Sequence, residues 1–380
     1  MHITTKAMKL FSLPLITLLL VNVLLHAQAP TDWVLGTQYN KGSLVSYEGI
    51  FYNAIQVVPG SVGGTPDTLT DYWVDIFSSR PDDDPGDPPN IDDPGSDFNS
   101  SNLTPPEDED VSSKLINIST RGYVGTGNDV MIAGFVIEGD ATATLKCMVG
   151  VSSGGMVEKD DFLILKDAFI ILTKDGVEIA RNNDWTELSA EDQQSIQDAN
   201  QVPGSTKDSA LVMDLGPGVY GVTVVGVGNT TGITNVGVND LGQNGGTGSC
   251  RILNISTRGK VLTGDSVMIA GFVISGSNET DTLRVKLSNN GPSLGDDPSS
   301  GFVSLKDPFL QLVAGATDSN NNWSERPDSE KSYLTENNQT PSDSRESFML
   351  KTLAPNAYGI VMSGVGGTTG NAIVGVTIAD

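Results

Sequence analysis

The chain has 380 residues, with 22 Lys and Arg against 47 Asp and Glu, and both of its histidines, His2 and His26, lie in the first 29 residues. Removal of those 29 residues as an export signal would leave no histidine and a net charge of −27, from 20 basic and 47 acidic side chains. This composition excludes Ser-His-Asp triads, Cys-His pairs and His-ligated zinc, and the charge disfavours binding to nucleic acid or to an anionic membrane.

The first 29 residues have the three parts of a secretory signal peptide. Lys6 and Lys9 form the basic start, residues 10–25 are mostly apolar, and Ala27-Gln28-Ala29 is a small-x-small cleavage site. No later apolar run reaches the roughly 18 residues that a membrane-spanning helix needs. We therefore expect a secreted, extracellular protein without membrane insertion.

Residues 30–78 form an aromatic-rich segment that we predict to be a small module. Its residues follow the spacing W-x5-Y-x2-G-x2-V-x-Y-x-G-x2-Y-x-A, then a proline and a final tryptophan (Trp33, Tyr39, Gly42, Val45, Tyr47, Gly49, Tyr52, Ala54, Pro66 and Trp73). This pattern resembles the family 5/12 carbohydrate-binding module, the chitin-binding type 3 module. The resemblance implies a small β fold that binds an insoluble polysaccharide such as chitin through flat aromatic faces.

The aromatic residues of such a short module serve two purposes, because a small unit also needs rings for its own core. In the family, the stacking rings commonly follow the Tyr-x-Ala segment, where this chain has the ringless stretch 55–58. We therefore predict Tyr39, Tyr72 and Trp73 as the carbohydrate-binding residues, with Tyr39 and Tyr72 as exposed platforms. The alternative is a retained scaffold whose rings fill its interior.

Residues 79–113 are predicted to be an acidic, proline-rich linker. Positions 81–110 contain eleven acids, seven prolines and no Lys or Arg. Such a segment buries too little apolar surface to offset its ordering entropy, and charge repulsion with proline stiffness favours an extended spacer. The spacing of an EF-hand calcium loop is absent.

The rest of the chain is a tandem duplication, repeat 1 (114–245) and repeat 2 (249–380). The segment N-I-S-T-R-G at 117–122 recurs at 254–259, and M-I-A-G-F-V-I at 131–137 recurs at 268–274. A period of about 137 residues predicts two separate globular domains. The repeats resemble a poorly characterised β-domain of secreted bacterial proteins.

The apolar segments of repeat 1 are short, rich in β-branched residues and separated by turn residues. We predict strands there at 130–137, 144–149, 169–173, 210–215, 220–227 and 233–238, with residues 229–232 as a hairpin connection. One helix is predicted at 189–199, with Ser189 as its N-cap. The fold class is therefore all-β: the small module plus two antiparallel β-sandwich domains.

Five residues retained in both repeats are the candidates for a duplicated site (Arg121/Arg258, Asp167/Asp307, Asn183/Asn321, Trp185/Trp323 and Tyr220/Tyr358). One interpretation is a sugar or peptide site built from Arg, Asp and Trp. The other, which we favour, is that the aromatics fill the sandwich core. A glycosidase would need two carboxylates across a groove, and the retained pairs Asp167/Asp307 and Asp208/Glu346 lie at strand starts without a cleft-forming insertion, so we expect no catalysis.

Two further features leave alternatives open. Asn183 and Asp184 are weak calcium candidates, because carboxylate and amide oxygens suit that ion, but runs of Asn also form turns. Cys147 and Cys250 have no counterparts in the other repeat, and in an exported protein they either pair or remain separate.

The sequence therefore predicts a secreted, non-catalytic protein that binds a chitin-like polysaccharide and needs no cofactor. At most it would be an accessory, substrate-targeting part of a glycoside hydrolase system. The alternative is an extracellular surface, matrix or adhesion protein whose repeats contact cell-surface proteins.

Overall fold

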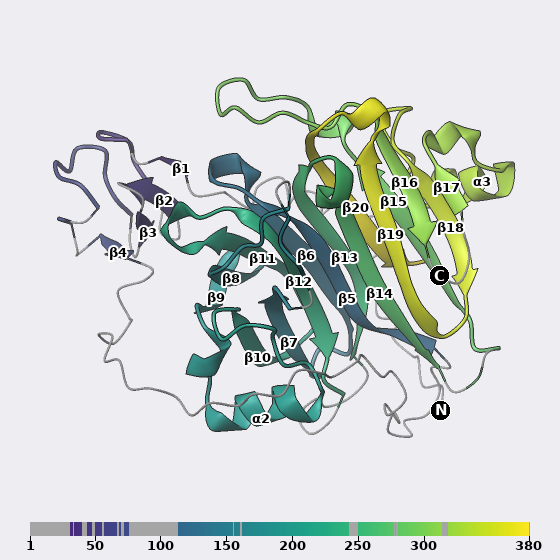
Figure 1. The fold of residues 1–380 in the computed structure, drawn as a ribbon, viewed down its shortest axis with the longest axis horizontal. Helices are drawn as coiled ribbons and strands as arrows, with labels where there is room; N and C mark the ends of the chain where they lie inside the picture. Colours follow the sequence, from purple (N-terminus) through teal and green to yellow (C-terminus); the bar gives the residue numbers. More distant parts are fainter. Residues whose placement is uncertain are drawn as a thin grey trace, which may run out of the picture. The chain divides into compact units, whose positions relative to one another are not determined.

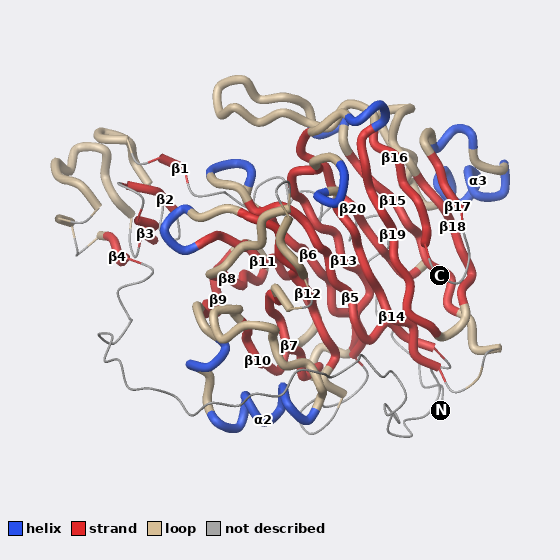
Figure 2. The backbone as a smooth tube through the Cα atoms, viewed as in Figure 1, coloured by secondary structure: helices blue, strands red, loops and turns tan. Residues whose placement is uncertain are grey.

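The computed structural model describes residues 31–75, with gaps at 33, 40–43, 48–49, 55–56, 67 and 70–71, and residues 113–379, with gaps at 155, 160–161, 243–249, 277, 279 and 314–317. Strands predominate among the described residues (Figure 2), which contain two α-helices, so the all-β prediction is confirmed. They form two compact units, one within Trp33–Val111 and one that includes Ser112–Asp380. The predicted signal peptide and nearly all of the predicted linker lie outside the described residues.

The small unit is an antiparallel β structure. After the short strand β1 (Thr31–Asp32), strands β2 (Leu44–Tyr47), β3 (Ile50–Ala54) and β4 (Trp73–Asp75) pair in chain order. Its buried cluster consists of Tyr39, Val45 and Val58, with Leu69 and Tyr72 packed against it. A tyrosine ring thus supplies much of an interior that has few aliphatic side chains.

The second unit contains sixteen strands, eight from each repeat (Figure 1). The six strands predicted for repeat 1 are all present, and two further strands, β5 and β9, were not predicted. The strands of repeat 1 are β5 (Ser113–Val124), β6 (Met131–Gly139), β7 (Leu145–Ser152), β8 (Ala168–Lys174), β9 (Val177–Asn182), β10 (Ala210–Leu215), β11 (Gly218–Gly226) and β12 (Gly232–Asp240). Those of repeat 2 are β13 (Cys250–Val261), β14 (Met268–Gly276), β15 (Leu283–Asn290), β16 (Pro308–Val313), β17 (Asp318–Asn320), β18 (Phe348–Leu353), β19 (Asn356–Gly364) and β20 (Gly370–Ile378).

Within each repeat the strands form two four-stranded antiparallel sheets. The orders in repeat 1 are β5-β12-β7-β10 and β6-β11-β8-β9. Repeat 2 has the same orders, β13-β20-β15-β18 and β14-β19-β16-β17. Two sheets of four strands with this connectivity form a jelly roll.

The sheets of the two repeats continue into each other. Strand β5 pairs antiparallel with β14 of repeat 2, and β13 pairs antiparallel with β6 of repeat 1. Two eight-stranded layers result, and they join into one sixteen-stranded sheet where β5 pairs in parallel with β13. The layers also contact each other at their ends, through β9 and β10 and through β17 and β18. The prediction of two separate globular domains was therefore wrong. In a separate repeat the long first strand would have an unpaired edge, and pairing across the repeats removes that edge.

The segment 229–232 is a tight turn but not a hairpin connection, which corrects the prediction. Strand β11 pairs with β6 and β8, whereas β12 pairs with β5 and β7, so the turn carries the chain from one sheet to the other. The turn requires glycine. Gly228 has φ +65°, and a Cβ on Gly226 would lie 2.0 Å from the carbonyl oxygen of Thr230.

A short helix follows β9 in repeat 1 and β17 in repeat 2. Helix α2 (Ala190–Asp198) begins as predicted, because the Ser189 hydroxyl accepts a hydrogen bond from the Asp192 amide at 3.1 Å. Its buried residue Ile196 packs with Met148 and Trp185. Helix α3 (Asp328–Glu336) packs through Tyr333 and Leu334 in the same way. No helix among the described residues is long and apolar enough to cross a membrane.

Candidate functional site

Tyr39 is not the exposed platform that we predicted. Its side chain is only 8% exposed and belongs to the buried cluster of the small unit. Its hydroxyl accepts a hydrogen bond from the Val34 amide at 2.7 Å, and its backbone bonds to Val58 in both directions. The ring is used for the interior of the module, because so short a chain has few other large apolar groups to bury.

Tyr72 lies at the boundary between the interior and the surface of the same unit. The ring is partly buried and packs against the cluster around Tyr39. The next residue, Trp73, begins strand β4 opposite Ala54, and its side chain lies outside the described part of the structure. Tyr72 therefore keeps a partly exposed ring, and the role of Trp73 remains a prediction.

The retained arginines each lie over a phenylalanine ring near the end of the first strand of a repeat. The Arg121 guanidinium is 5.3 Å from the centre of the Phe162 ring, and that of Arg258 is 5.9 Å from Phe302. Arg258 is only 5% exposed, and this burial lowers the pKa of its guanidinium. Such stacking is a structural use of arginine, and sequence analysis did not identify either phenylalanine as its partner.

The retained Trp and Asn residues lie in the connection between the fifth and sixth strands of each repeat, β9 to β10 and β17 to β18. The Trp185 indole N–H donates to the Ser205 carbonyl at 3.0 Å, and that of Trp323 donates to the Asp343 carbonyl at 3.1 Å. The Asn321 carbonyl accepts a hydrogen bond from the Ser347 hydroxyl at 3.0 Å. Trp185 belongs to the cluster beneath α2, whereas Arg121 lies beside Phe162, so the structure does not bring these two residues into one site.

The retained tyrosines are core residues. Tyr220 stacks on Phe135 with ring centres 5.0 Å apart, and Tyr358 stacks on Phe272 at 5.3 Å. The Tyr220 hydroxyl donates to the Gly216 carbonyl four residues earlier, at 2.7 Å. These contacts support the interpretation that duplicated aromatics fill the sandwich.

The acidic pair Asp208 and Glu346 is buried and binds neighbouring loops. Asp208 is 2% exposed and accepts hydrogen bonds from the backbone and hydroxyl of Ser153 and from the Ser205 amide. Glu346 is fully buried and accepts from Gly291, Ser293 and Asn290. Burial raises the pKa of both carboxyls, and the hydrogen bonds oppose the rise. Neither group opens into a cleft, which is the arrangement of a structural acid.

Amide substitution at the two positions should therefore destabilise the protein to different extents. In Asp208→Asn the new amide group faces the Ser205 backbone N–H, which cannot reorient, so we expect a loss of about 1–2 kcal/mol. In Glu346→Gln the amide faces the side chain of Asn290, which can turn its own oxygen toward it, so the loss should stay below about 1 kcal/mol. Urea unfolding of both variants measures the difference. A larger loss in Glu346→Gln would contradict this account.

The calcium candidates lie at the connection after β9. Asp184 is 7% exposed, and one of its carboxylate oxygens accepts a hydrogen bond from the Lys207 ammonium at 3.0 Å. Among the described residues, no group of three or more His, Cys, Asp or Glu side chains is placed to hold a metal ion. A calcium role for Asn183 and Asp184 stays a prediction.

Cys147 and Cys250 are both free thiols in this structure. Cys147 is buried in β7, where burial raises the pKa of its thiol, and Cys250 begins β13 opposite Gly139. The structure therefore does not contain the disulfide between the repeats that the sequence left open. The strands that pair between the repeats hold the repeats together without a disulfide.

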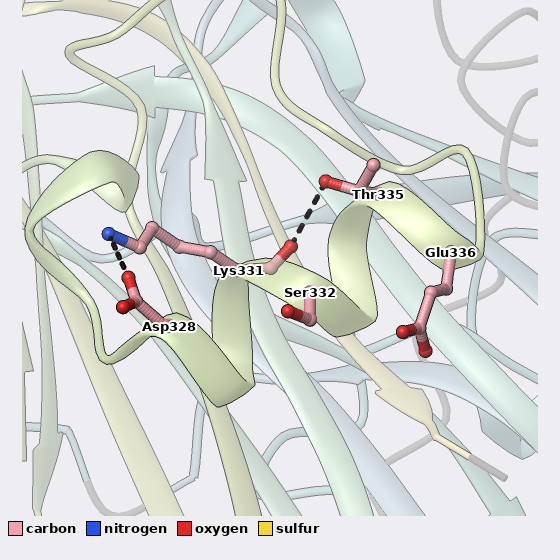
Figure 3. A pocket seen from close by; sticks show the side chains of 5 residues that line it. All are labelled: Asp328, Lys331, Ser332, Thr335 and Glu336. Carbon is pink, nitrogen blue, oxygen red and sulfur yellow. Dashed lines mark hydrogen bonds and ion pairs between the residues drawn. The ribbon is translucent and has the colours of Figure 1, made fainter.

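One shallow depression lies on α3 and is shown in Figure 3. It is lined by residues of this helix alone (Asp328, Lys331, Ser332, Thr335 and Glu336). The Lys331 ammonium pairs with Asp328 at 2.9 Å, and the Thr335 hydroxyl donates to the Lys331 carbonyl. Groups from one short helix do not converge on a ligand, so this depression is not a site of the kind that a substrate requires.

Comparison with models of known protein families gives no match, and comparison with characterised proteins gives none either. The candidate site therefore rests on the geometry alone. That geometry leaves Tyr72, with its neighbour Trp73, as the predicted ligand-contacting position.

Proposed function

We propose that this protein is an extracellular, non-catalytic attachment protein whose small module binds an insoluble, chitin-like polysaccharide. The double jelly roll would be the rigid body that the module attaches to the polysaccharide. The observation that supports this most directly is the partly exposed ring of Tyr72 beside Trp73. A flat ring can stack on the apolar face of a sugar, and interactions of this kind contribute on the order of 1–3 kcal/mol per ring on other planar ligands.

The contacts of the retained polar residues that the structure describes are consistent with this proposal. The retained acids Asp208 and Glu346 each accept hydrogen bonds from their own repeat. The retained arginines lie over Phe162 and Phe302, and the retained tyrosines stack on Phe135 and Phe272. These contacts give the duplicated positions a structural role and support the small module as the part that binds.

Retention of the full chain on insoluble chitin and cellulose tests the proposal. We expect Tyr72→Ala and Trp73→Ala each to weaken binding about tenfold, as the loss of one stacking ring would. Tyr72→Phe is the matched control, because it keeps the flat face and removes only the hydroxyl. A wild-type chain that is not retained on any glycan, or an alanine variant that binds like the wild type, would overturn the proposal.

The alternative function is adhesion through protein contacts of the double jelly roll. The observation that favours it is the edge strand β9, where Val177 and Ile179 are 67% and 41% exposed. An exposed apolar edge is a place where another chain can add a strand. Retention on cell-surface protein instead of glycan, lost in Ile179→Lys, would support this function.

A further inference from the structure

The two repeats are related by an approximate two-fold axis that runs between their first strands. The Thr120 hydroxyl of β5 hydrogen bonds to the Thr257 hydroxyl of β13 at 2.8 Å, and both side chains are fully buried. These residues are each other's equivalents in the duplication. A residue that contacts its own equivalent lies on the symmetry axis, which is the signature of an isologous interface.

The contacts on either side of the axis are reciprocal. Strand β5 pairs with β14, and the equivalent strand β13 pairs with β6, the equivalent of β14. A Cβ on Gly122 would meet Met131 and Met268, and a Cβ on Gly259 would meet the same two methionines. The side chains that fill this junction, meaning the contact between β5–β6 and β13–β14, are therefore the same on both sides.

This reciprocity explains which segments are identical in the two repeats. The segment at 131–137 forms β6, and its copy at 268–274 forms β14. The segments at 117–122 and 254–259 lie within β5 and β13. The longest identical segments are thus the strands of the junction, because each copy has to fit the same partner surface.

Charged groups at one end of the junction also cross between the repeats. The Arg121 guanidinium donates to the Asp265 carbonyl at 2.6 Å, and Lys159 forms an ion pair with the Asp265 carboxylate. In the opposite direction, Lys260 pairs with Asp129, which also accepts a hydrogen bond from the Asn371 amide at 2.8 Å. Each repeat therefore contributes both signs of charge to the other.

We propose that each repeat carries a self-complementary interaction surface, formed by its first two strands, whose partner is another repeat of the same kind. In this chain the two copies occupy each other's surface. The covalent connection at 243–249 raises their effective concentration but is not required for their association.

Cutting that connection in the full chain tests the proposal. A recognition sequence for a site-specific protease replaces residues 243–249, and the folded protein is cut and examined by analytical ultracentrifugation and circular dichroism. We expect the fragments to sediment together with the mass of the uncut chain and to keep its β spectrum at micromolar concentration. Separation of the fragments, whether folded or unfolded, would overturn the proposal.

A pair of charge reversals in the cut protein locates the surface. Lys260→Glu reverses an ion pair across the junction, and Lys306→Glu reverses the pair with Asp296 inside repeat 2. Both lysines are partly exposed, so each change should be tolerated by the fold. We expect Lys260→Glu to weaken the association of the fragments about three- to tenfold at low salt, and Lys306→Glu to leave it unchanged. Equal effects of the two would contradict the assignment of the surface.

Discussion

Replacing Phe272 by alanine should lower the free energy of unfolding by about 3–5 kcal/mol, the usual loss for a buried phenylalanine. The ring is 1% exposed and stacks on Tyr358 with an interplanar angle of 21°. It also lies on β14 opposite Ile118 of β5, so its surroundings come from both repeats. The change removes a large apolar volume that neighbouring strands, tied by hydrogen bonds on both sides, cannot easily fill.

The equivalent change in repeat 1, Phe135→Ala, should destabilise the same cooperative unfolding transition as Phe272→Ala. Because strands of both repeats pair within one sixteen-stranded sheet, we expect one main unfolding transition by calorimetry, and each variant should shift all of it. Separate domains would instead give two transitions, with each variant moving one of them. Val177→Ala is the control, since that side chain is 67% exposed and its loss should change stability by less than about 0.5 kcal/mol. A variant that shifts only part of the main transition would contradict a single shared sandwich.

Local structure could be predicted from the sequence where one segment determines it. The β-branched runs of repeat 1 predicted its strands, because β-branched residues pack well on a pleated, buried surface, and most of these strands are buried along their length. The Ser189 cap predicted the start of α2, because the hydrogen bond that forms it spans three residues. Strand β5 was missed because its segment mixes apolar residues with Ser119, Thr120 and Gly122. Thr120 contacts its equivalent Thr257 of β13, and the pattern of a single strand does not reveal such a partner.

The pairing of the repeats could not be predicted, because a repeat period carries no information on which edges meet. Identity between copies indicated that Arg121, Trp185 and Tyr220 are needed, but identical residues serve a duplicated core and a duplicated site equally well. The module aromatics posed the same difficulty. The spacing of Tyr39 fits either an exposed ring that binds a sugar or a ring in the core of the module. Its contacts with Val45 and Val58, which the sequence does not reveal, show that it lies in the core.

Lys286→Met should stabilise the protein by about 2 kcal/mol at neutral pH. Lys286 is 5% exposed on β15, and its ammonium donates to the Gln339 side-chain oxygen at 2.6 Å. The pairing registers place it where repeat 1 has Met148, since Lys286 lies opposite Leu350 and Thr377, and Met148 opposite Val212 and Asn239. Methionine therefore fits this position in the repeat. The loss of the Gln339 hydrogen bond offsets part of the gain.

The gain should depend on pH in a direction fixed by the pKa of Lys286. Burial lowers this pKa from 10.5 to about 8 in the folded protein. Between those values the unfolded chain binds more protons than the folded one, so the wild type gains stability as pH rises, by up to about 3 kcal/mol in total. Below about pH 8 the buried amine is charged, and its burial then lowers the free energy of unfolding most, so the advantage of methionine is largest there.

Urea unfolding from pH 7 to 10 should show this advantage shrinking, with the exposed Lys306→Met as the control that changes little. A methionine variant less stable than the wild type at pH 7, or a pH-independent difference, would contradict a charged amine buried at this position.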